Sequence, residues 1–159
     1  MEFVALSDTV LNHLARQHPD LNKVFQGVFP ADKSPTVPKT SLEWCLHCQR
    51  RPRRSAWEHW LAIWTQNRVC EVFDSYGLPL SSYQNLKLQA WFTQWKEVIT
   101  SDHTLQAMDN HTCGHYALLF LRAKSKHHSF EDFLGQWNSQ NLVLNGRRVG
   151  EKIQRLIET

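Results

Sequence analysis

The sequence has few cysteines, no long apolar run and no basic segment at its start, and each absence excludes a class of protein. Four cysteines in 159 residues are too sparse for a scaffold built on disulfides. No apolar run approaches the ~20 residues that a membrane-spanning helix needs, so no membrane partner is expected. The first ten residues lack a basic segment followed by a long apolar stretch. We therefore expect no secretory signal and a soluble, intracellular protein.

What the sequence does contain is typical of one globular unit. Its 159 residues suit a single domain spanning residues 1–159. With 42% hydrophobic and 21% charged residues, the chain can bury a core and is not disordered. Seven tryptophans and eight phenylalanines predict a core rich in large rings.

The basic charge is concentrated in one short segment. The net charge is +3, and it falls to −1 when the four arginines of RRPRR are left out: Arg50, Arg51, Arg53 and Arg54. One interpretation is a solvated loop. The other is a contact with nucleic-acid phosphates or a nuclear-import signal.

Hydrophobic periodicity and breakers predict an α+β fold. We expect helices over residues 7–18 and 86–95, from 113 onward, after a cap at 129, and over 148–157. We expect strands over residues 42–48, 59–65 and 68–74, with short strand pieces at 98–99 and 105. The short link Gln66-Asn67 predicts an antiparallel hairpin between the second and third strands. The proline-rich residues 26–40 are expected to form an ordered loop.

Cys113 directly precedes the apolar stretch GHYALLFLRA, which predicts a buried helix. A thiol at the start of a helix lies near the positive end of the helix dipole, which favours a reactive thiolate. Gly114 lets backbone approach a substrate closely. The alternative is a buried cysteine that merely begins a core helix, which is common for free cysteines.

A nucleophilic cysteine needs a base, an orienting group and an oxyanion donor. His59 begins one strand of the predicted hairpin, followed by Trp60, and Asp74 ends the other strand. The hairpin therefore places His59 and Asp74 at the same end of the sheet. Gln106, seven residues before Cys113, can present an amide as oxyanion donor. Taken singly, these residues could also be a surface histidine, a turn aspartate and an exposed glutamine.

The segments EHWLAIW and VFDSYG, followed by Gln106 with six residues before Cys113-Gly114, resemble the adenain and SUMO-protease clan of cysteine proteases. Within that clan the sequence is most similar to adenovirus-type endopeptidases and their relatives in adenovirus-like viruses and virus-like DNA transposons. The segment GVFPADKSP resembles a loop of those relatives. The resemblance covers about residues 25–137.

The resemblance implies a papain-like fold of the adenain/SUMO-protease type, with a central mixed sheet flanked by helices. It implies that Cys113 is the nucleophile, His59 the general base and acid, Asp74 the orienting carboxylate and Gln106 the oxyanion donor. Trp60 matches the His-Trp pair of the family, and Gly114 is its neighbour at the site. No cofactor or metal is implied for the chemistry.

The resemblance also implies substrates, activators and a location. It predicts polypeptide substrates, namely viral structural precursors cleaved at Gly-containing sites during virion maturation, and action in the host nucleus and the virion. It predicts activation by DNA, with Arg50–Arg54 as the contact, or by a peptide. The family's disulfide-linked peptide activation is not expected here, because residues 75–105 contain no cysteine.

Three alternatives remain open at this stage. The same four residues would serve a protease that removes ubiquitin or a ubiquitin-like modifier. A non-catalytic scaffold could instead bind nucleic acid through the arginine cluster. Cys45 and Cys48 have the spacing of half a zinc site, but no second pair of ligands follows at a suitable distance.

Overall fold

The computed structural model describes most of the chain and arranges it as a mixed sheet with helices on both faces. It describes residues 4–30, 43–50, 58–83 and 86–159, and gives only the backbone for 30, 43–50 and 58. The strands are β1 (Phe25–Pro30), β2 (Glu43–Arg50), β3 (Glu58–Gln66), β4 (Val69–Phe73) and β5 (Glu97–Thr100). The α-helices are α1 (Asp8–Gln17), α2 (Pro19–Asn22), α3 (Leu86–Phe92), α4 (Cys113–Ser125), α5 (Phe130–Gly135) and α6 (Leu142–Glu158), and η1 (Leu80–Ser82) is a 3₁₀ turn.

The five strands follow the order of the sequence, β1-β2-β3-β4-β5. The two inner pairings, β2 with β3 and β3 with β4, are antiparallel, whereas β1 and β5 add at the edges in parallel. The hairpin between β3 and β4 closes through Asn67 and Arg68, which have φ of 51° and 65°. Positive φ at both residues is the geometry that a two-residue hairpin turn needs. The predicted hairpin is therefore confirmed, with its turn one residue later than expected.

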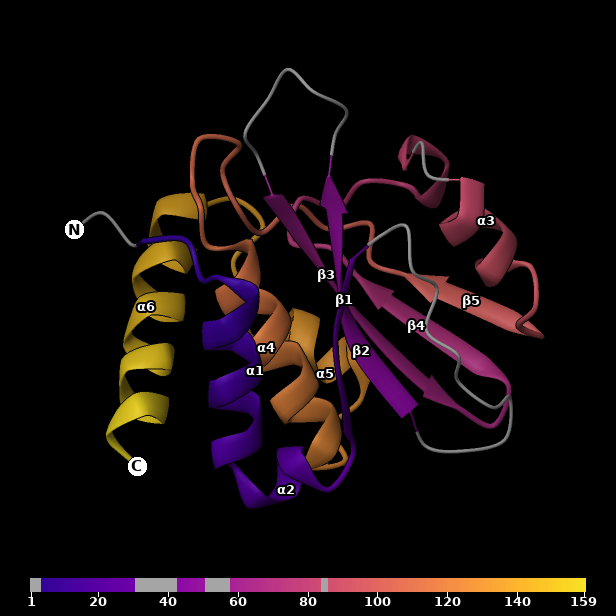
Figure 1. The fold of residues 1–159 in the computed structure, drawn as a ribbon. Helices are drawn as coiled ribbons and strands as arrows, with labels where there is room; N and C mark the ends of the chain where they lie inside the picture. Colours follow the sequence, from indigo (N-terminus) through magenta and orange to yellow (C-terminus); the bar gives the residue numbers. More distant parts are fainter. Residues whose placement is uncertain (1–3, 31–42, 51–57, 84–85) are drawn as a thin grey trace.

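Strand β3 is covered on both faces, which explains its nearly continuous apolar sequence. Trp60, Ala62 and Trp64 belong to the core shared with α1, α4, α5 and α6. Leu61 and Ile63 belong to a second cluster, with the aromatic residues of and after α3. Figure 1 shows the corresponding layers, with α3 alone on one side of the sheet and the other α-helices on the opposite side.

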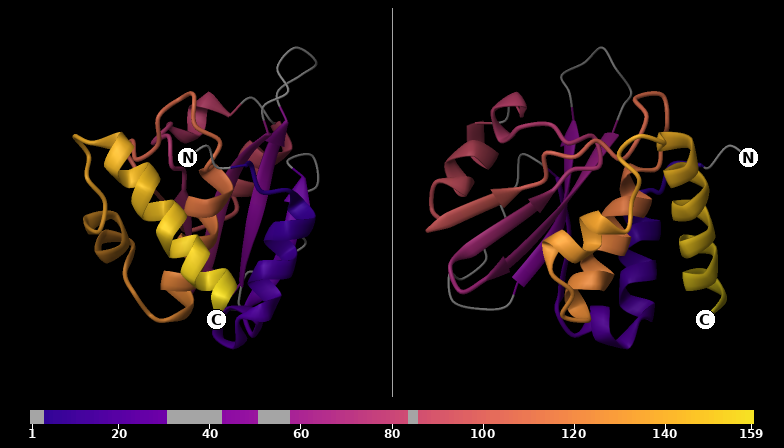
Figure 2. Two further views of the ribbon diagram at one scale, coloured as in Figure 1. Left: turned by 90° about the vertical axis from the view of Figure 1, so that its left-hand side faces the viewer. Right: turned by 180° about the vertical axis from the view of Figure 1, so that it is seen from behind.

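Helix α4 is the central helix of the larger layer. It contacts β3, α1, α5 and α6, and all nine residues from Cys113 to Leu121 are buried. Near its C-terminal end, Lys124 forms an ion pair of 2.8 Å with Glu71 of β4. Figure 2 shows α6 on the outer side of this layer, passing in front of α4 in the left-hand view. The apolar sequence GHYALLFLRA thus forms the predicted buried helix.

Several expectations about the elements are wrong in detail. Residues 25–30 form strand β1 instead of the start of a loop; the rest of that expected loop lies outside the described residues. Helix α6 begins at Leu142, six residues before the predicted start, and α3 ends at Phe92 instead of residue 95. Leu105 is buried in a loop and belongs to no strand.

Candidate active site

His59 and Asp74 meet at one end of the β3–β4 hairpin. The ladder pairs Ala62 with Phe73, so His59 lies three residues before the last pair and Asp74 directly after it. His59 Nε2 lies 2.8 Å from Asp74 Oδ1. The His59 side chain is 13% exposed and that of Asp74 is 2% exposed, so water competes little for this hydrogen bond.

The Asp74 carboxylate is held from several sides. Oδ1 also accepts a hydrogen bond of 2.8 Å from the backbone N–H of Tyr76. Oδ2 accepts a hydrogen bond from the hydroxyl of Tyr83, a residue just beyond η1. Burial, followed by the Asp74 charge and this hydrogen bond, raises the pKa of Tyr83. The Tyr83 phenol therefore stays neutral and remains a hydrogen-bond donor to Asp74.

The second ring nitrogen of His59 is the one left for the thiol. The His59 side chain interacts with both Asp74 and Cys113. Nε2 is bound to Asp74, whereas Nδ1 is buried and makes no hydrogen bond within the described residues. Burial lowers the pKa of His59, but the interactions with Asp74 and Cys113 outweigh it and raise this pKa to about 9. At neutral pH the imidazole is therefore protonated.

Cys113 is the first residue of α4, where backbone N–H groups lack partners within the helix. The side chain of the preceding Thr112 accepts no capping hydrogen bond, and a backbone hydrogen bond of 3.1 Å runs from Tyr116 N to Thr112 O. The helix begins against β3: a Cβ placed on Gly114 would lie 3.1 Å from Trp60 Cδ1. Trp60 itself is fixed by a hydrogen bond of 3.0 Å from its Nε1 to Leu6 O. Gly114 and Trp60 thus set how closely the thiol approaches the sheet.

The turn after Asp74 holds the loop that carries Gln106. Gly77 has φ of +66°, and a Cβ there would lie 2.7 Å from the backbone carbon of His103. Leu105 N and Gln106 N both donate to Ser75 O, at 2.8 and 3.1 Å. The sequence Asp-Ser-Tyr-Gly is therefore an ordinary turn, as one interpretation held, and it also positions Asp74 and Gln106 relative to each other.

Gln106 is 1% exposed, and its amide is fully oriented. Its Oε1 accepts a hydrogen bond of 2.6 Å from the Ser75 hydroxyl, and its Nε2 donates to the carbonyl of Asn110. The second amide hydrogen has Tyr76 Oη at 3.4 Å, a weak acceptor that a stronger one can replace. The acceptor, Asn110, lies three residues before Cys113, so this hydrogen bond joins Gln106 to the segment that leads into α4.

Tyr76 contacts His59, Gln106 and the segment before Cys113. Its ring centroid lies 4.7 Å from that of His59, and its hydroxyl donates to Asn110 O at 3.1 Å. Burial, followed by the charges of Cys113, Asp74 and Asp109, raises the pKa of Tyr76 to about 12. The half-buried phenol therefore remains neutral beside the His59–Cys113 pair.

The structure brings the sequence-predicted residues together, but their catalytic roles remain predictions. His59, Asp74 and Cys113 are linked directly, while Gln106 is connected through Ser75 and Asn110. Trp60 and Gly114 pack against each other. Of the arginine cluster, Arg50 ends β2 without a described side chain, and Arg51, Arg53 and Arg54 lie outside the described residues.

Sequence reasoning missed the two tyrosines of the site. Tyr76 lies within the motif VFDSYG, two residues after Asp74, so the sequence itself indicated that it would lie near the carboxylate. Tyr83 follows Asp74 by nine residues in a segment without periodicity, and no sequence signal indicates its contact with the carboxylate.

Within the described parts of the chain, no group of three or more His, Cys, Asp or Glu side chains could hold a metal ion. Cys70 and Cys113, which lie in that part of the chain, are buried and form no disulfide. None of the described helices is both long and apolar enough to cross a membrane.

No protein-family model matches the chain, and no curated protein matches it. Among solved structures, the central domain of the uncharacterized Lpg1148 protein from Legionella pneumophila is similar, with a TM-score of 0.51 and 11% identity over 99% of this chain and 100% of that one. The ASFV pS273R protease is also similar, with a TM-score of 0.41 and 20% identity over 60% of this chain. The match spans 39% of that protease's length. The likeness to the Legionella domain concerns the fold alone.

Proposed function

We propose that this protein is a cysteine protease in which Cys113 is the nucleophile. One observation carries the proposal: a single histidine, His59, is hydrogen-bonded to a buried aspartate and interacts with a thiol at a helix N-terminus. A buried carboxylate orients such an imidazole and stabilises its protonated form. A structural histidine would need neither the thiol nor the helix start beside it.

The arrangement supports a two-step acyl transfer. The Cys113 thiolate attacks the scissile carbonyl, and the His59 imidazolium donates its Nδ1 proton to the leaving amine. The oxyanion of the tetrahedral intermediate takes the second hydrogen of Gln106 Nε2, in place of Tyr76 Oη, together with the backbone N–H of Cys113. Neutral His59 then removes a proton from water, which hydrolyses the thioester and restores the pair.

The finer assignment is an adenain-type, papain-like endopeptidase that cleaves viral structural precursors at Gly-containing sites in the nucleus and virion. It rests on the sequence motifs around His59, Asp74 and Cys113. Activation by DNA or by a peptide belongs to the same assignment. The alternative substrate, a ubiquitin-like modifier, also presents Gly-Gly at its C-terminus. The two hypotheses therefore share the catalytic residues and differ in the part of the substrate that precedes Gly-Gly.

Covalent probes separate these substrates. The protein is incubated with a Leu-x-Gly-Gly peptide aldehyde, or with ubiquitin and SUMO carrying a C-terminal vinyl sulfone, and the intact mass is measured. We expect adducts on the wild type and none on Cys113→Ala. Labelling by the peptide probe alone supports precursor processing, and labelling by a modifier probe supports deconjugation. No adduct with either probe, also after DNA is added, would contradict the protease assignment.

A further inference from the structure

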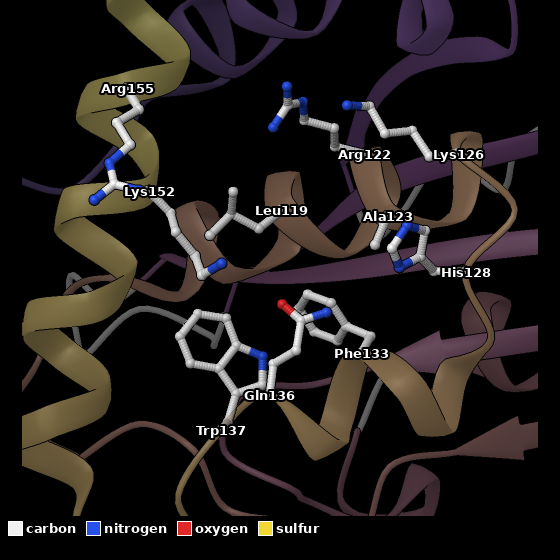
Figure 3. A pocket seen from close by; sticks show the side chains of 10 residues that line it. All are labelled: Leu119, Arg122, Ala123, Lys126, His128, Phe133, Gln136, Trp137, Lys152 and Arg155. Atoms are coloured by element: carbon white, nitrogen blue, oxygen red, sulfur yellow. The ribbon is translucent and has the colours of Figure 1, made fainter.

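A basic pocket lies away from the candidate active site, between the C-terminal half of α4 and helices α5 and α6 (Figure 3). Its volume is about 290 Å³, at the lower end of the range for small-molecule sites. The basic pocket is defined by five side chains that can carry positive charge: Arg122, Lys126, His128, Lys152 and Arg155. No acidic residue lines it.

The four permanent charges of the basic pocket belong to Arg122, Lys126, Lys152 and Arg155. These residues take part in none of the ion pairs of the described residues. The neighbouring Lys124 differs, because it turns to the sheet and pairs with Glu71. Acidic residues line adjoining hollows: Glu151 shares one with Lys152 and Arg155, and Asp20 and Glu158 share another with Arg122 and Lys126.

The positive charge of the basic pocket acts on the neighbouring side chain of His18. His18 shares an adjoining hollow with Arg122 and Lys126. Burial, followed by the charge of Arg122 and, more weakly, that of Lys126, lowers the pKa of His18. Cations near the C-terminal end of α4 could simply neutralise the partial negative charge of the helix dipole. That charge is only about half an elementary charge, far less than the four positive charges present.

The pocket also offers an apolar wall and an unused donor. Leu119, Phe133 and Trp137 line it beside the cations. The indole Nε1–H of Trp137 is buried without an acceptor in the described part of the chain. An oxyanion seated against this ring would supply the missing acceptor. In Figure 3 the ammonium group of Lys152 points into the space between α4 and Trp137, while Arg122 and Lys126 approach each other across its upper edge.

We propose that the basic pocket binds a compact oligophosphate. Arginine and lysine form charge-assisted hydrogen bonds to phosphate oxygens, and several phosphates on one small molecule match four cations that line one pocket. A concave hollow of this size suits such a ligand better than duplex nucleic acid, which is bound by protruding or extended basic surfaces. This site is independent of the proposed protease activity.

Calorimetric titration with sodium tripolyphosphate at low salt tests the proposal. Arg122→Gln/Lys152→Gln should weaken binding at least about tenfold, because it removes two groups that form charge-assisted hydrogen bonds to phosphate oxygens. Arg147→Gln is the matched control, because Arg147 is an exposed arginine of α6 that does not line the pocket. It should bind like the wild type. If the first double variant does not fold by circular dichroism, Lys126→Gln/Arg155→Gln replaces it.

Two further titrations identify the source of the phosphates. Tighter binding of ATP than of tripolyphosphate would support the proposal and place a nucleoside against Trp137. Three results would overturn it: no binding of tripolyphosphate, equal weakening by Arg147→Gln, or binding of a short DNA duplex without binding of tripolyphosphate.

Discussion

Asp74 is the residue on which the candidate site depends most. Its two oxygens accept hydrogen bonds from His59 Nε2, the Tyr76 backbone and the Tyr83 hydroxyl. A carboxylate that is 2% exposed needs such partners, because burying an unpaired charge is costly. The same carboxylate helps to raise the pKa of His59 to about 9. Peptide cleavage needs protonated His59 as acid, so kcat/KM should fall as the pH rises through about 9.

Tyr83→Phe tests how this carboxylate is held. Loss of the hydroxyl removes one donor from Asp74 and should lower the free energy of unfolding by about 1–3 kcal/mol. With less of its charge engaged elsewhere, Asp74 should raise the pKa of His59 further, so the alkaline fall in kcat/KM should move to higher pH. The measurement is the pH profile of peptide hydrolysis, with Asp74→Asn as reference. In Asp74→Asn the alkaline fall in kcat/KM should move to lower pH, towards about 6.5, the pKa of an unperturbed histidine. This substitution should reduce the rate of hydrolysis less than His59→Ala does.

A merely packing role for Tyr83 makes a different prediction. Looser packing would weaken the contact between Asp74 and His59, and the alkaline fall would move down or stay in place. Either result for Tyr83→Phe would remove Tyr83 from the positioning of the carboxylate.

At the scale of elements, the start of α4 is fixed by one close approach to β3. Gly114 faces Trp60, and a Cβ would lie 3.1 Å from Trp60 Cδ1 and 3.4 Å from Leu11 Cδ1. Both neighbours are buried, at 4% and 0% exposed, so neither has open space to move into. The Cys-Gly and His-Trp pairs are therefore two halves of one packing contact.

Gly114→Ala should destabilise the protein by about 1–3 kcal/mol, because an added methyl group overpacks this contact. Gly135→Ala is the control: Gly135 is also helical, but nothing lies within 4 Å of its Cβ position. That control should be neutral or stabilise by up to about 1 kcal/mol. Urea unfolding of both variants compares them directly. Equal effects of the two substitutions would contradict the close approach.

Elements with a strong local sequence pattern lie in the structure where the sequence predicted them. The β3–β4 hairpin and α4 carry strong periodic signals over a short stretch of chain. Strand β1 was missed because it pairs in parallel with a strand that starts 13 residues after β1 ends, and parallel partners leave no turn signature. The first turns of α6 were missed because Gly146, a weak helix former, is buried there against Asn110.

For the site, the sequence predicted those residues that belong to motifs. His59, Asp74 and Cys113 were found because hairpin geometry and a helix start bring them together. Tyr83 was not, because its contact with Asp74 depends on the path of an irregular segment through η1. Tertiary contacts of loops leave no periodic trace in the sequence.

At the scale of the molecule, α4 connects two chemically distinct regions. Its first residue, Cys113, lies at the candidate active site, and its C-terminal half forms a wall of the basic pocket. The central helix is buried over nine consecutive residues, so it is one of the most rigid parts of the fold. The sheet contributes the base and the carboxylate, whereas the helical layer contributes the nucleophile. Their relative placement therefore depends on the whole core.

The most direct test of the central claim is the rate of alkylation of Cys113 by iodoacetamide at pH 7, read by peptide mass mapping. A thiol without a partner is only a few per cent ionised at this pH, so a thiolate paired with His59 should react more than about tenfold faster. His59→Gln is the variant to compare, because its amide can still donate to Asp74. We predict rapid modification of Cys113 in the wild type, at least about tenfold slower in His59→Gln, and no modification of the fully buried Cys70 in either protein. Equal rates in wild type and variant would contradict the account.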